Sequence, residues 1–272
     1  MIEIEMSGRS VLVTGGTRGL GRAIGLEFAR AGATVFLTHH WQSADERALL
    51  NEYSRQGLEP PHILEADVAD ADQTREVLHT IRETVGTLDI FISNVAFSKV
   101  ITGVKDLKKN SFDLSLGYSA WPLIDYVQAA QEVIGKYPRY VLAVSSDGAQ
   151  VCHSGYDLAG SSKAVLETLC RYLAVRLKGA GVRVNAIRPG FLDTASSRST
   201  FGDAVIDSMQ KEVEGLFLEP QEVARAAVAL CSGLMDAITG QVITIDEGWS
   251  LIGPMEFVTR RGLPQAFPKD GG

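Results

Sequence analysis

The stretch TGGTRGLG, Thr14 to Gly21, decides the fold class because of what stands on either side of it. The apolar, β-branched run SVLV before it predicts a buried strand. The segment RAIGLEFARAGA after it has helical spacing and ends near Gly32, a typical helix stop signal. Glycine permits positive φ and a close approach to a pyrophosphate, and a helix N-terminus offers free N–H groups. We therefore predict a dinucleotide-binding turn, and the alternative is a glycine-rich turn without a ligand.

Strand-like and helix-like segments alternate along the rest of the chain. Further strands are expected at 34–40, 61–68, 88–96, 140–146, 182–190 and 240–248, and helices at 43–57, 71–86, about Ser111–Lys136, and around Lys163. Apolar strands that alternate with helices predict a parallel sheet covered on both faces. We expect one α/β domain over residues 1–252, a doubly wound Rossmann-type fold with a seven-stranded parallel sheet. Residues 253–272 are rich in Gly and Pro, and we expect an irregular C-terminal tail there.

The composition limits the functions that the chain can have. Its 272 residues are 45% hydrophobic and 22% charged, as in ordinary globular proteins. The net charge of −7 argues against nucleic acid and anionic membranes as partners. No apolar run reaches the roughly 18 residues that span a bilayer, and the first ten residues contain no secretory h-region. We expect a cytoplasmic protein, in which Cys152, Cys170 and Cys231 are free thiols that pack among apolar residues.

The glycine turn and five later segments together resemble the short-chain dehydrogenase/reductase family. The glycine spacing is G-x-x-x-G-x-G, and it is followed in order by ADV at 66–68, SNVA at 93–96, Ser146, Lys163 and RPGFLDT at 188–194. The resemblance extends to about Ile252 and implies a nicotinamide cofactor across the carboxyl ends of the strands. The cofactor-binding residues that it implies are Gly15, Thr17, Arg18, Gly19, Leu20, Gly21, Asp67, Val68, Asn94, Ala96, Lys163, Pro189, Gly190, Leu192 and Thr194.

The end of the second strand bears on which nicotinamide cofactor is used. A site for NAD usually carries Asp or Glu there, which accepts hydrogen bonds from the ribose 2′-hydroxyl. Here the positions hold Thr38, His39, His40 and Trp41, so no carboxylate would repel a 2′-phosphate. Arg18 in the glycine turn could pair with that phosphate, and His39 or His40 could assist. We expect NADPH rather than NADH, and the alternative is that these residues are merely solvated.

The separation of Tyr156 and Lys163 bears on the reaction. Most members of the family have these two residues four positions apart on one helix, but here they are seven apart, and Ala159 occupies the usual tyrosine position. On a continuous helix seven positions are about 700° of rotation and ~10.5 Å of rise. Tyr156 would then face the same cleft as Lys163 but lie further along the axis. A phenol so displaced no longer sits where a simple ketone oxygen would be.

The seven-residue separation, Tyr-x6-Lys, resembles the enoyl-acyl-carrier-protein reductase branch of the family. In that branch the hydride goes to the β carbon of an α,β-unsaturated thioester, and the displaced Tyr would stabilise the enolate oxygen. The resemblance assigns catalysis to Tyr156, Lys163 and Ser146, with Lys163 holding the nicotinamide ribose. Ser119 stands where ketone-reducing members carry Asn, and Glu247 stands where a glycine is usual.

Two alternatives remain open at this stage. A ketoreductase acting on a 3-oxoacyl thioester or other carbonyl would need Tyr156 brought closer by a locally unwound helix start, which Gly155 and Gly160 would permit. A catalytically inactive, cofactor-binding member of the family is the second alternative. We place a working reductase ahead of an inactive protein because Lys163, the glycine turn and the proline–glycine turn are all present. We place enoyl reduction ahead of carbonyl reduction because Tyr156 and Lys163 have the wide separation of the enoyl reductase branch.

The segment from about 191 to 217 is expected to form a lid over the substrate. Its apolar side chains, with Phe97, Trp121 and Tyr156, suit an acyl chain. The resemblance implies an acyl thioester substrate, carried by acyl carrier protein or coenzyme A, in fatty-acid or polyketide-type biosynthesis, and a homotetramer. Four basic residues could meet an acidic carrier or a phosphopantetheine group, and the alternative is a solvated face. They are Lys99, Lys105, Lys108 and Lys109.

Overall fold

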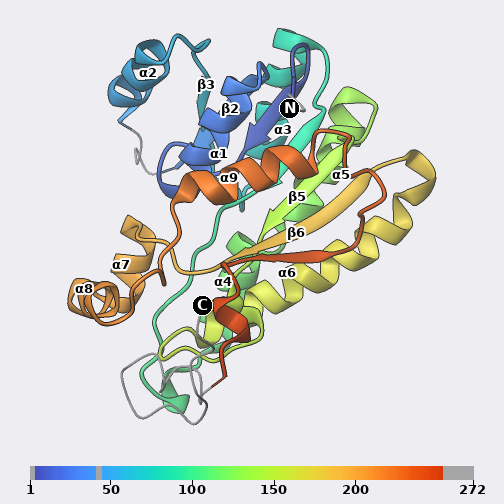
Figure 1. Ribbon diagram of the computed structural model, residues 1–272. Coiled ribbons are helices and arrows are strands. Elements are labelled where there is room, and N and C mark those ends of the chain that lie inside the picture. Colours follow the sequence, from blue (N-terminus) through green and yellow to red (C-terminus); the bar gives the residue numbers. More distant parts are fainter. Residues whose placement is uncertain (1–3, 41–44, 254–272) are drawn as a thin grey trace.

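The protein folds around one parallel sheet with helices on both faces (Figure 1). The computed structural model describes residues 4–40 and 45–253. The strands lie in the order β3-β2-β1-β4-β5-β6-β7, and all neighbouring pairs are parallel. Their bounds are β1 Ser10–Val13, β2 Thr34–His39, β3 His62–Glu65, β4 Ile90–Ser93, β5 Tyr140–Val144, β6 Arg183–Pro189 and β7 Val242–Ile245. The predicted seven-stranded parallel sheet is confirmed.

The helices connect successive strands in the pattern that the sequence predicts. In the described residues they are α1 Gly19–Arg30, α2 Glu46–Arg55, α3 Ala71–Val85, α4 Lys109–Ser119, α5 Pro122–Ile134, α6 Asp157–Arg176, α7 Ala195–Phe201, α8 Asp203–Glu212 and α9 Pro220–Leu230. Short 3-10 turns are η1 Val104–Asp106, η2 Asp147–Ala149, η3 Lys178–Ala180 and η4 Trp249–Leu251.

The two faces of the sheet carry separate hydrophobic cores. On one face α1 packs against α9, and its apolar side chains meet those of the sheet. On the other face α3, α5 and α6 cover the sheet. Because both faces are covered, every residue of β1, β4 and β5 is buried. This explains why these strands are apolar throughout rather than alternating, apart from Ser10 and Ser93 at their ends.

The site is positioned by the point where the strand order reverses. The chain runs from β1 outward to β2 and β3, and then returns to place β4 on the other side of β1. The connections that follow β1 and β4 therefore diverge and leave a crevice at the carboxyl ends of these two strands. Open parallel sheets bind their ligands at such a crevice.

One expectation about the helices is wrong. The helix expected over about Ser111–Lys136 is two helices, α4 and α5, which separate at Ala120 and Trp121. The cause is Pro122, whose missing N–H and fixed ring cannot continue a helix but suit its first position. Trp41 and the tail from residue 254 lie outside the described residues. Within the described part of the chain, no helix is long and apolar enough to cross a membrane.

Candidate active site

The glycine turn after β1 has the geometry that its sequence predicts. Gly15 and Gly19 adopt positive φ, +62° and +53°, which side chains rarely tolerate. A Cβ atom on Gly21 would overlap the carbonyl oxygen of Gly15, so the third glycine is needed for the turn to fold back on α1. Helix α1 starts at Gly19, and its first N–H groups therefore face the crevice. An anionic pyrophosphate fits this turn.

Asn94 secures the turn from the neighbouring strand. Its side-chain amide donates hydrogen bonds to the carbonyl oxygens of Thr14 at 2.9 Å and Gly15 at 3.3 Å, and its backbone N–H donates to the Thr14 hydroxyl. The resemblance assigned Asn94 to cofactor binding. In this structure its amide supports the turn. The residue also lines the main cleft, which lies between the glycine turn, the end of β5, Lys163 and helix α7, and direct cofactor contact stays a prediction.

A smaller cavity beside the turn suits the adenosine end of a dinucleotide. It is bordered by the turn, the end of β2, and the segments after β3 and β4, and Tyr118 from α4 closes it. The Tyr118 hydroxyl donates to Asp67 at 2.9 Å, and His40 lies 3.5 Å from the same carboxylate. Sequence reasoning missed Tyr118, which is distant from every cofactor motif. The predicted residues that line this cavity are Gly15, Thr17, Arg18, His39, His40, Asp67, Val68 and Ala96.

The two histidines at the end of β2 differ in accessibility. His39 is buried, and its Nε2 lies 3.6 Å from a carboxylate oxygen of Glu46. The His40 side chain is partly exposed. Arg18, which is exposed in the glycine turn, also borders this cavity. Of these candidates for a 2′-phosphate, Arg18 and His40 are therefore better placed than His39.

Lys163 lines the main cleft from helix α6. Its side chain is only 3% exposed, and its ammonium group donates a 2.6 Å hydrogen bond to the carbonyl oxygen of Val144 at the end of β5. Burial lowers the pKa of Lys163 to about 8, although the charge of Glu167 one turn further along α6 works in the opposite direction. The remaining ammonium protons are available to a hydroxyl group in the cleft.

Tyr156 lies just before helix α6, not within it. It is the N-cap residue, and α6 begins at Asp157, so Tyr156 stands at the helix start, as the sequence predicts, and the helix proper begins one residue later. The preceding residue, Gly155, has φ +77°, which turns the chain before the helix can start. Tyr156 and Lys163 nevertheless line the same cleft.

Close packing fixes the Tyr156 ring. A Cβ atom on Gly148 would approach two ring carbons of Tyr156 to 2.5 Å, and a Cβ on Gly160 would overlap the Gly148 carbonyl. The ring also stacks on Phe201 with centroids 5.7 Å apart. Burial raises the pKa of the phenol, and a hydrogen bond with Ser146 acts against that rise. Tyr156 is thus a protonated donor at neutral pH.

The two serines of the site have different environments. The Ser146 hydroxyl donates to Asp147 at 3.1 Å and accepts from the backbone N–H of Gly148 at 3.2 Å. Ser119 exchanges hydrogen bonds with the backbone N–H and carbonyl of Phe97. Ser119 therefore fixes the chain after β4, and Ser146 is the hydroxyl next to Tyr156.

Helices α7 and α8 occupy the region expected to be a lid. Phe191 pairs with Phe217 as an isolated parallel bridge, and Thr194 caps α7 through a hydrogen bond from the N–H of Ser197. Closure over a substrate stays a prediction. The predicted residues of this region that line the main cleft are Pro189, Gly190, Phe191, Leu192, Thr194 and Phe201, and those of the glycine turn are Gly15, Arg18, Gly19, Leu20 and Gly21.

Two further expectations are wrong. Trp121 is 53% exposed and does not line the cavities around Tyr156, because the helix break at Pro122 turns it outward. Cys152 is exposed rather than packed, since it lies in the turn-rich connection between β5 and α6.

Glu247, where a glycine is usual, has φ +52°. The backbone there keeps a conformation that favours glycine, and a non-glycine residue in it is strained. Among the described residues no cluster of His, Cys, Asp and Glu could hold a metal ion.

Known proteins share this fold and these motifs. The family model described as enoyl-(acyl carrier protein) reductase matches residues 15–250. The chain is 30% identical to an NADH-dependent enoyl-[acyl-carrier-protein] reductase of Synechocystis sp., covering 92% of this chain and 99% of that one. It is 27% identical to a 3-oxoacyl-[acyl-carrier-protein] reductase of Thermotoga maritima, covering 90% and 99%. The crystal structure of the Bacillus cereus enoyl-acyl carrier protein reductase with NADP+ and indole naphthyridinone superposes with a TM-score of 0.81 at 25% identity, covering 93% and 100%.

Proposed function

The chain belongs to the short-chain dehydrogenase/reductase family of oxidoreductases, and from this we propose that it uses NADPH to reduce the carbon–carbon double bond of an enoyl thioester. The observation that carries the proposal is the position of Tyr156. It is seven residues before Lys163, outside the helix, and its partly buried ring is fixed against Gly148 in the wall of the cleft that Lys163 also lines.

The residues of the cleft fit a nicotinamide dinucleotide. The glycine turn and the start of α1 suit the pyrophosphate, and the cavity around Asp67 and Tyr118 suits the adenosine. Lys163 would hold the nicotinamide ribose, because its buried ammonium keeps protons free beyond its bond to Val144. When bound, the cofactor supplies a hydride to the substrate.

The protein's own part in the reaction is to stabilise negative charge and supply a proton. Hydride addition at the β carbon leaves an enolate, with the charge on the thioester oxygen. The Tyr156 hydroxyl can donate a hydrogen bond to that oxygen, and a preorganised donor in a water-poor cleft stabilises developing charge strongly. Lys163 keeps the local potential positive. Protonation of the α carbon then completes the saturated thioester.

A ketoreductase is the second candidate, and a specific observation supports it. Because α6 begins only at Asp157, Tyr156 is not held inside the helix, and this would ease the approach of its hydroxyl to a carbonyl. Ser146 also lies beside Tyr156, where a serine could hold a carbonyl substrate. The 3-oxoacyl reductase of Thermotoga maritima is a relative of comparable similarity. We rank it second because the wide separation of Tyr156 and Lys163 is typical of the enoyl branch.

The substrate carrier and the assembly belong to the same proposal. An acyl thioester on acyl carrier protein or coenzyme A, a cytoplasmic location, a biosynthetic role with fatty acids or polyketides, and a homotetramer are all proposed from family resemblance. Exposed apolar side chains on α4 and α6, notably Tyr172 at 66% and Val175 at 76%, support burial against another copy of the chain.

The test is a direct comparison of two substrates. Purified protein is mixed with NADPH and either crotonyl or acetoacetyl thioester, each as coenzyme A and carrier-protein forms, and loss of reduced nicotinamide is followed. We expect turnover with the crotonyl thioester. Turnover with acetoacetyl alone would establish the ketoreductase instead. Tight NADPH binding without turnover of either would favour an inactive, cofactor-binding protein.

A further inference from the structure

An ion pair lies beside Tyr156 that the proposed reaction does not use. Within the connection between β5 and α6, the Nε2 of His153 lies 2.7 Å from Oδ2 of Asp147. The two side chains are 20% and 26% exposed, so the pair is half-buried rather than freely solvated. No motif of the family pointed to it.

The pair is connected to Tyr156 through Ser146. The other carboxylate oxygen of Asp147 accepts a 3.1 Å hydrogen bond from the Ser146 hydroxyl. Ser146 also lies close enough to the Tyr156 phenol to act against the rise in its pKa. His153, Asp147 and Ser146 thus form a chain of polar contacts that ends beside the proposed donor.

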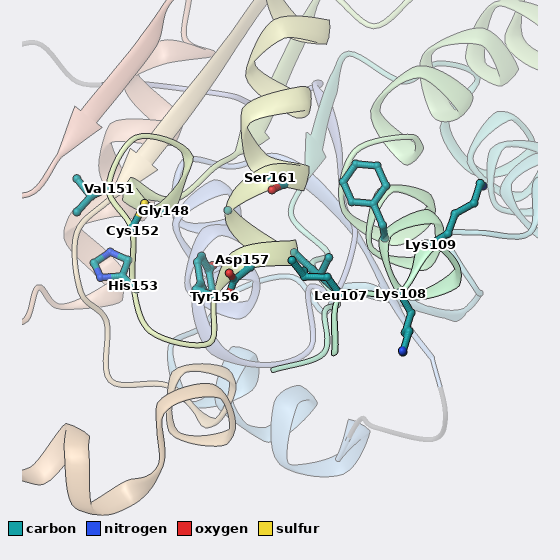
Figure 2. A pocket seen from close by; sticks show the side chains of 13 residues that line it. Leu107, Lys108, Lys109, Gly148, Val151, Cys152, His153, Tyr156, Asp157 and Ser161 are labelled. Carbon is teal, nitrogen blue, oxygen red and sulfur yellow. The ribbon is translucent and has the colours of Figure 1, made fainter. Parts of the chain in front are cut away.

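His153 also contacts the lid region. Its ring meets Phe191 edge-on with centroids 5.6 Å apart, and Phe201 and Tyr156 at 6.2 Å each. Because Phe201 stacks on Tyr156, one imidazole touches both aromatic partners of the cleft wall. Figure 2 shows His153 beside Val151 and Cys152, next to Tyr156, on the wall of a cavity of about 590 Å³ that faces Leu107 and Lys108.

We propose that His153 is a positioning residue, which in its protonated form holds Asp147 and Ser146 in place against Tyr156 and offsets the negative charge of Asp147. The proposal rests on the proposed reductase function, in which Tyr156 stabilises an anion. An uncompensated carboxylate beside Tyr156 would oppose that anion, and the charge of Asp147 does raise the pKa of the phenol.

The pair has a definite pH window. The hydrogen bond and charge of Asp147 raise the pKa of His153 above its ordinary value of 6.5, against the effect of burial. Burial alone would raise the pKa of Asp147, but His153 lowers it below 3.8. The ion pair therefore exists between the lowered pKa of Asp147 and the raised pKa of His153, and it is lost as the pH rises through the latter. The other titratable groups around the pair are Cys152, Tyr156 and Asp157 beside it, Lys108 and Lys109 across the cavity, and Asp246, which interacts with Asp147.

Two variants separate the ion pair from the ring packing. His153→Phe keeps the aromatic contacts but removes the hydrogen bond to Asp147. We expect kcat/KM to fall by roughly ten- to a hundredfold, which corresponds to the loss of one charged hydrogen bond. The affinity for NADPH should stay unchanged. His153→Gln keeps a donor without a titrating group. We expect its kcat/KM to fall only a fewfold at neutral pH. We also expect it to lack the decline in kcat/KM above the His153 pKa that the proposal predicts for the native protein.

The controls isolate His153 from other groups. His79→Gln, on the exposed face of α3, removes a remote histidine and is expected to keep the native pH profile. Asp147→Asn removes the partner charge and is expected to flatten the profile as His153→Gln does. Should His153→Phe fail to fold, His153→Gln and Asp147→Asn decide the question alone.

A readout without turnover separates this proposal from the reaction itself. NMR titration of the His153 imidazole, assigned by difference from His153→Gln, is expected to give a pKa above 6.5 in the native protein and a lower pKa in Asp147→Asn. That result would stand even if neither thioester is reduced. The proposal is overturned by a native-like kcat/KM in His153→Phe, by a pH decline retained in His153→Gln, or by a His153 pKa that is unchanged in Asp147→Asn.

Discussion

Two ion pairs flank the proposed catalytic residues, and they differ in almost every respect. Behind Lys163, Glu167 and Arg188 are 7% and 8% exposed and joined by hydrogen bonds of 2.8 to 3.1 Å. Beside Tyr156, Asp147 and His153 are 26% and 20% exposed and are joined by one hydrogen bond. The first pair links α6 to β6. The second pair lies within the connection between β5 and α6, and its histidine also contacts Phe191 and Phe201 of the lid region.

The difference indicates that the two sides of the cleft have different roles. The buried pair is completed by Ser145, which donates to Glu167 at 2.6 Å, and by Gln150, which accepts from Arg188 at 2.8 Å. Removal of either charged side chain would leave the other charge buried and unpaired in an apolar interior. The half-exposed pair can titrate near neutral pH because one partner is a histidine. We therefore expect the Lys163 side to govern stability and the Tyr156 side to govern turnover.

The largest effect is expected from breaking the buried pair. Arg188→Met leaves Glu167 charged and buried, and removal of one partner of such a pair costs about 3–5 kcal/mol. Urea denaturation measures this loss of unfolding free energy. The double variant Arg188→Met with Glu167→Leu should recover much of it, because no unpaired charge remains. His153→Phe should cost no more than about 1 kcal/mol. Equal losses of unfolding free energy in Arg188→Met and His153→Phe would contradict the expected difference between the two ion pairs.

The next effect tests the turnover side. Tyr156→Phe keeps the ring that packs on Gly148 and Phe201 but removes the hydroxyl. Loss of one donor to a developing oxyanion lowers kcat by about 10²–10³, and we expect this with crotonyl thioester while stability and NADPH affinity stay nearly unchanged. Steady-state kinetics and a fluorescence titration with NADPH measure the two quantities. Unchanged turnover would exclude the Tyr156 hydroxyl from the mechanism.

The sequence predicts the framework of this site well, for a physical reason. The turn from Thr14 to Gly21 is local, so its glycines, its strand and its helix are visible together. Parallel order and the crevice then follow from the alternation of elements. The separation of Tyr156 and Lys163 also predicts correctly that both line one cleft, although the helix starts one residue after Tyr156.

What the sequence does not predict are contacts between side chains. Asp147 and His153 are six residues apart with no helical or strand periodicity between them, and only the turn η2 brings them together. Tyr118 reaches Asp67 across 51 positions of sequence. The family motif predicts that Asn94 binds the cofactor, but the sequence does not show that its side chain also supports the glycine turn. Such contacts depend on tertiary packing, which produces no periodic pattern in the sequence.

A smaller effect concerns the pH dependence of cofactor binding on the Lys163 side. Burial lowers the pKa of Lys163 from 10.5 to about 8, so its ammonium is lost at a pH where exposed lysines stay charged. Since the protonated form would hold the ribose, NADPH affinity should fall by about tenfold as the pH rises through 8, the size of one charged hydrogen bond. Fluorescence titrations across pH measure it. In Lys163→Met the affinity should be weak and the step absent; a step that persists there belongs to another group.

The smallest effect is expected at the exposed edge of the cofactor side. Arg18 borders the adenosine cavity and is exposed, so a contact with a 2′-phosphate would be screened by water. Arg18→Ala should therefore reduce the preference for NADPH over NADH by only about three- to fivefold, which is what an exposed charge pair contributes. Arg22→Ala is the matched control, since Arg22 lies one turn further along α1 and pairs with Glu52 instead. The ratio of kcat/KM for the two cofactors measures the effect. An unaltered ratio in Arg18→Ala would move the phosphate site to His40, whose side chain is the other accessible cation-forming group of that cavity within the described residues.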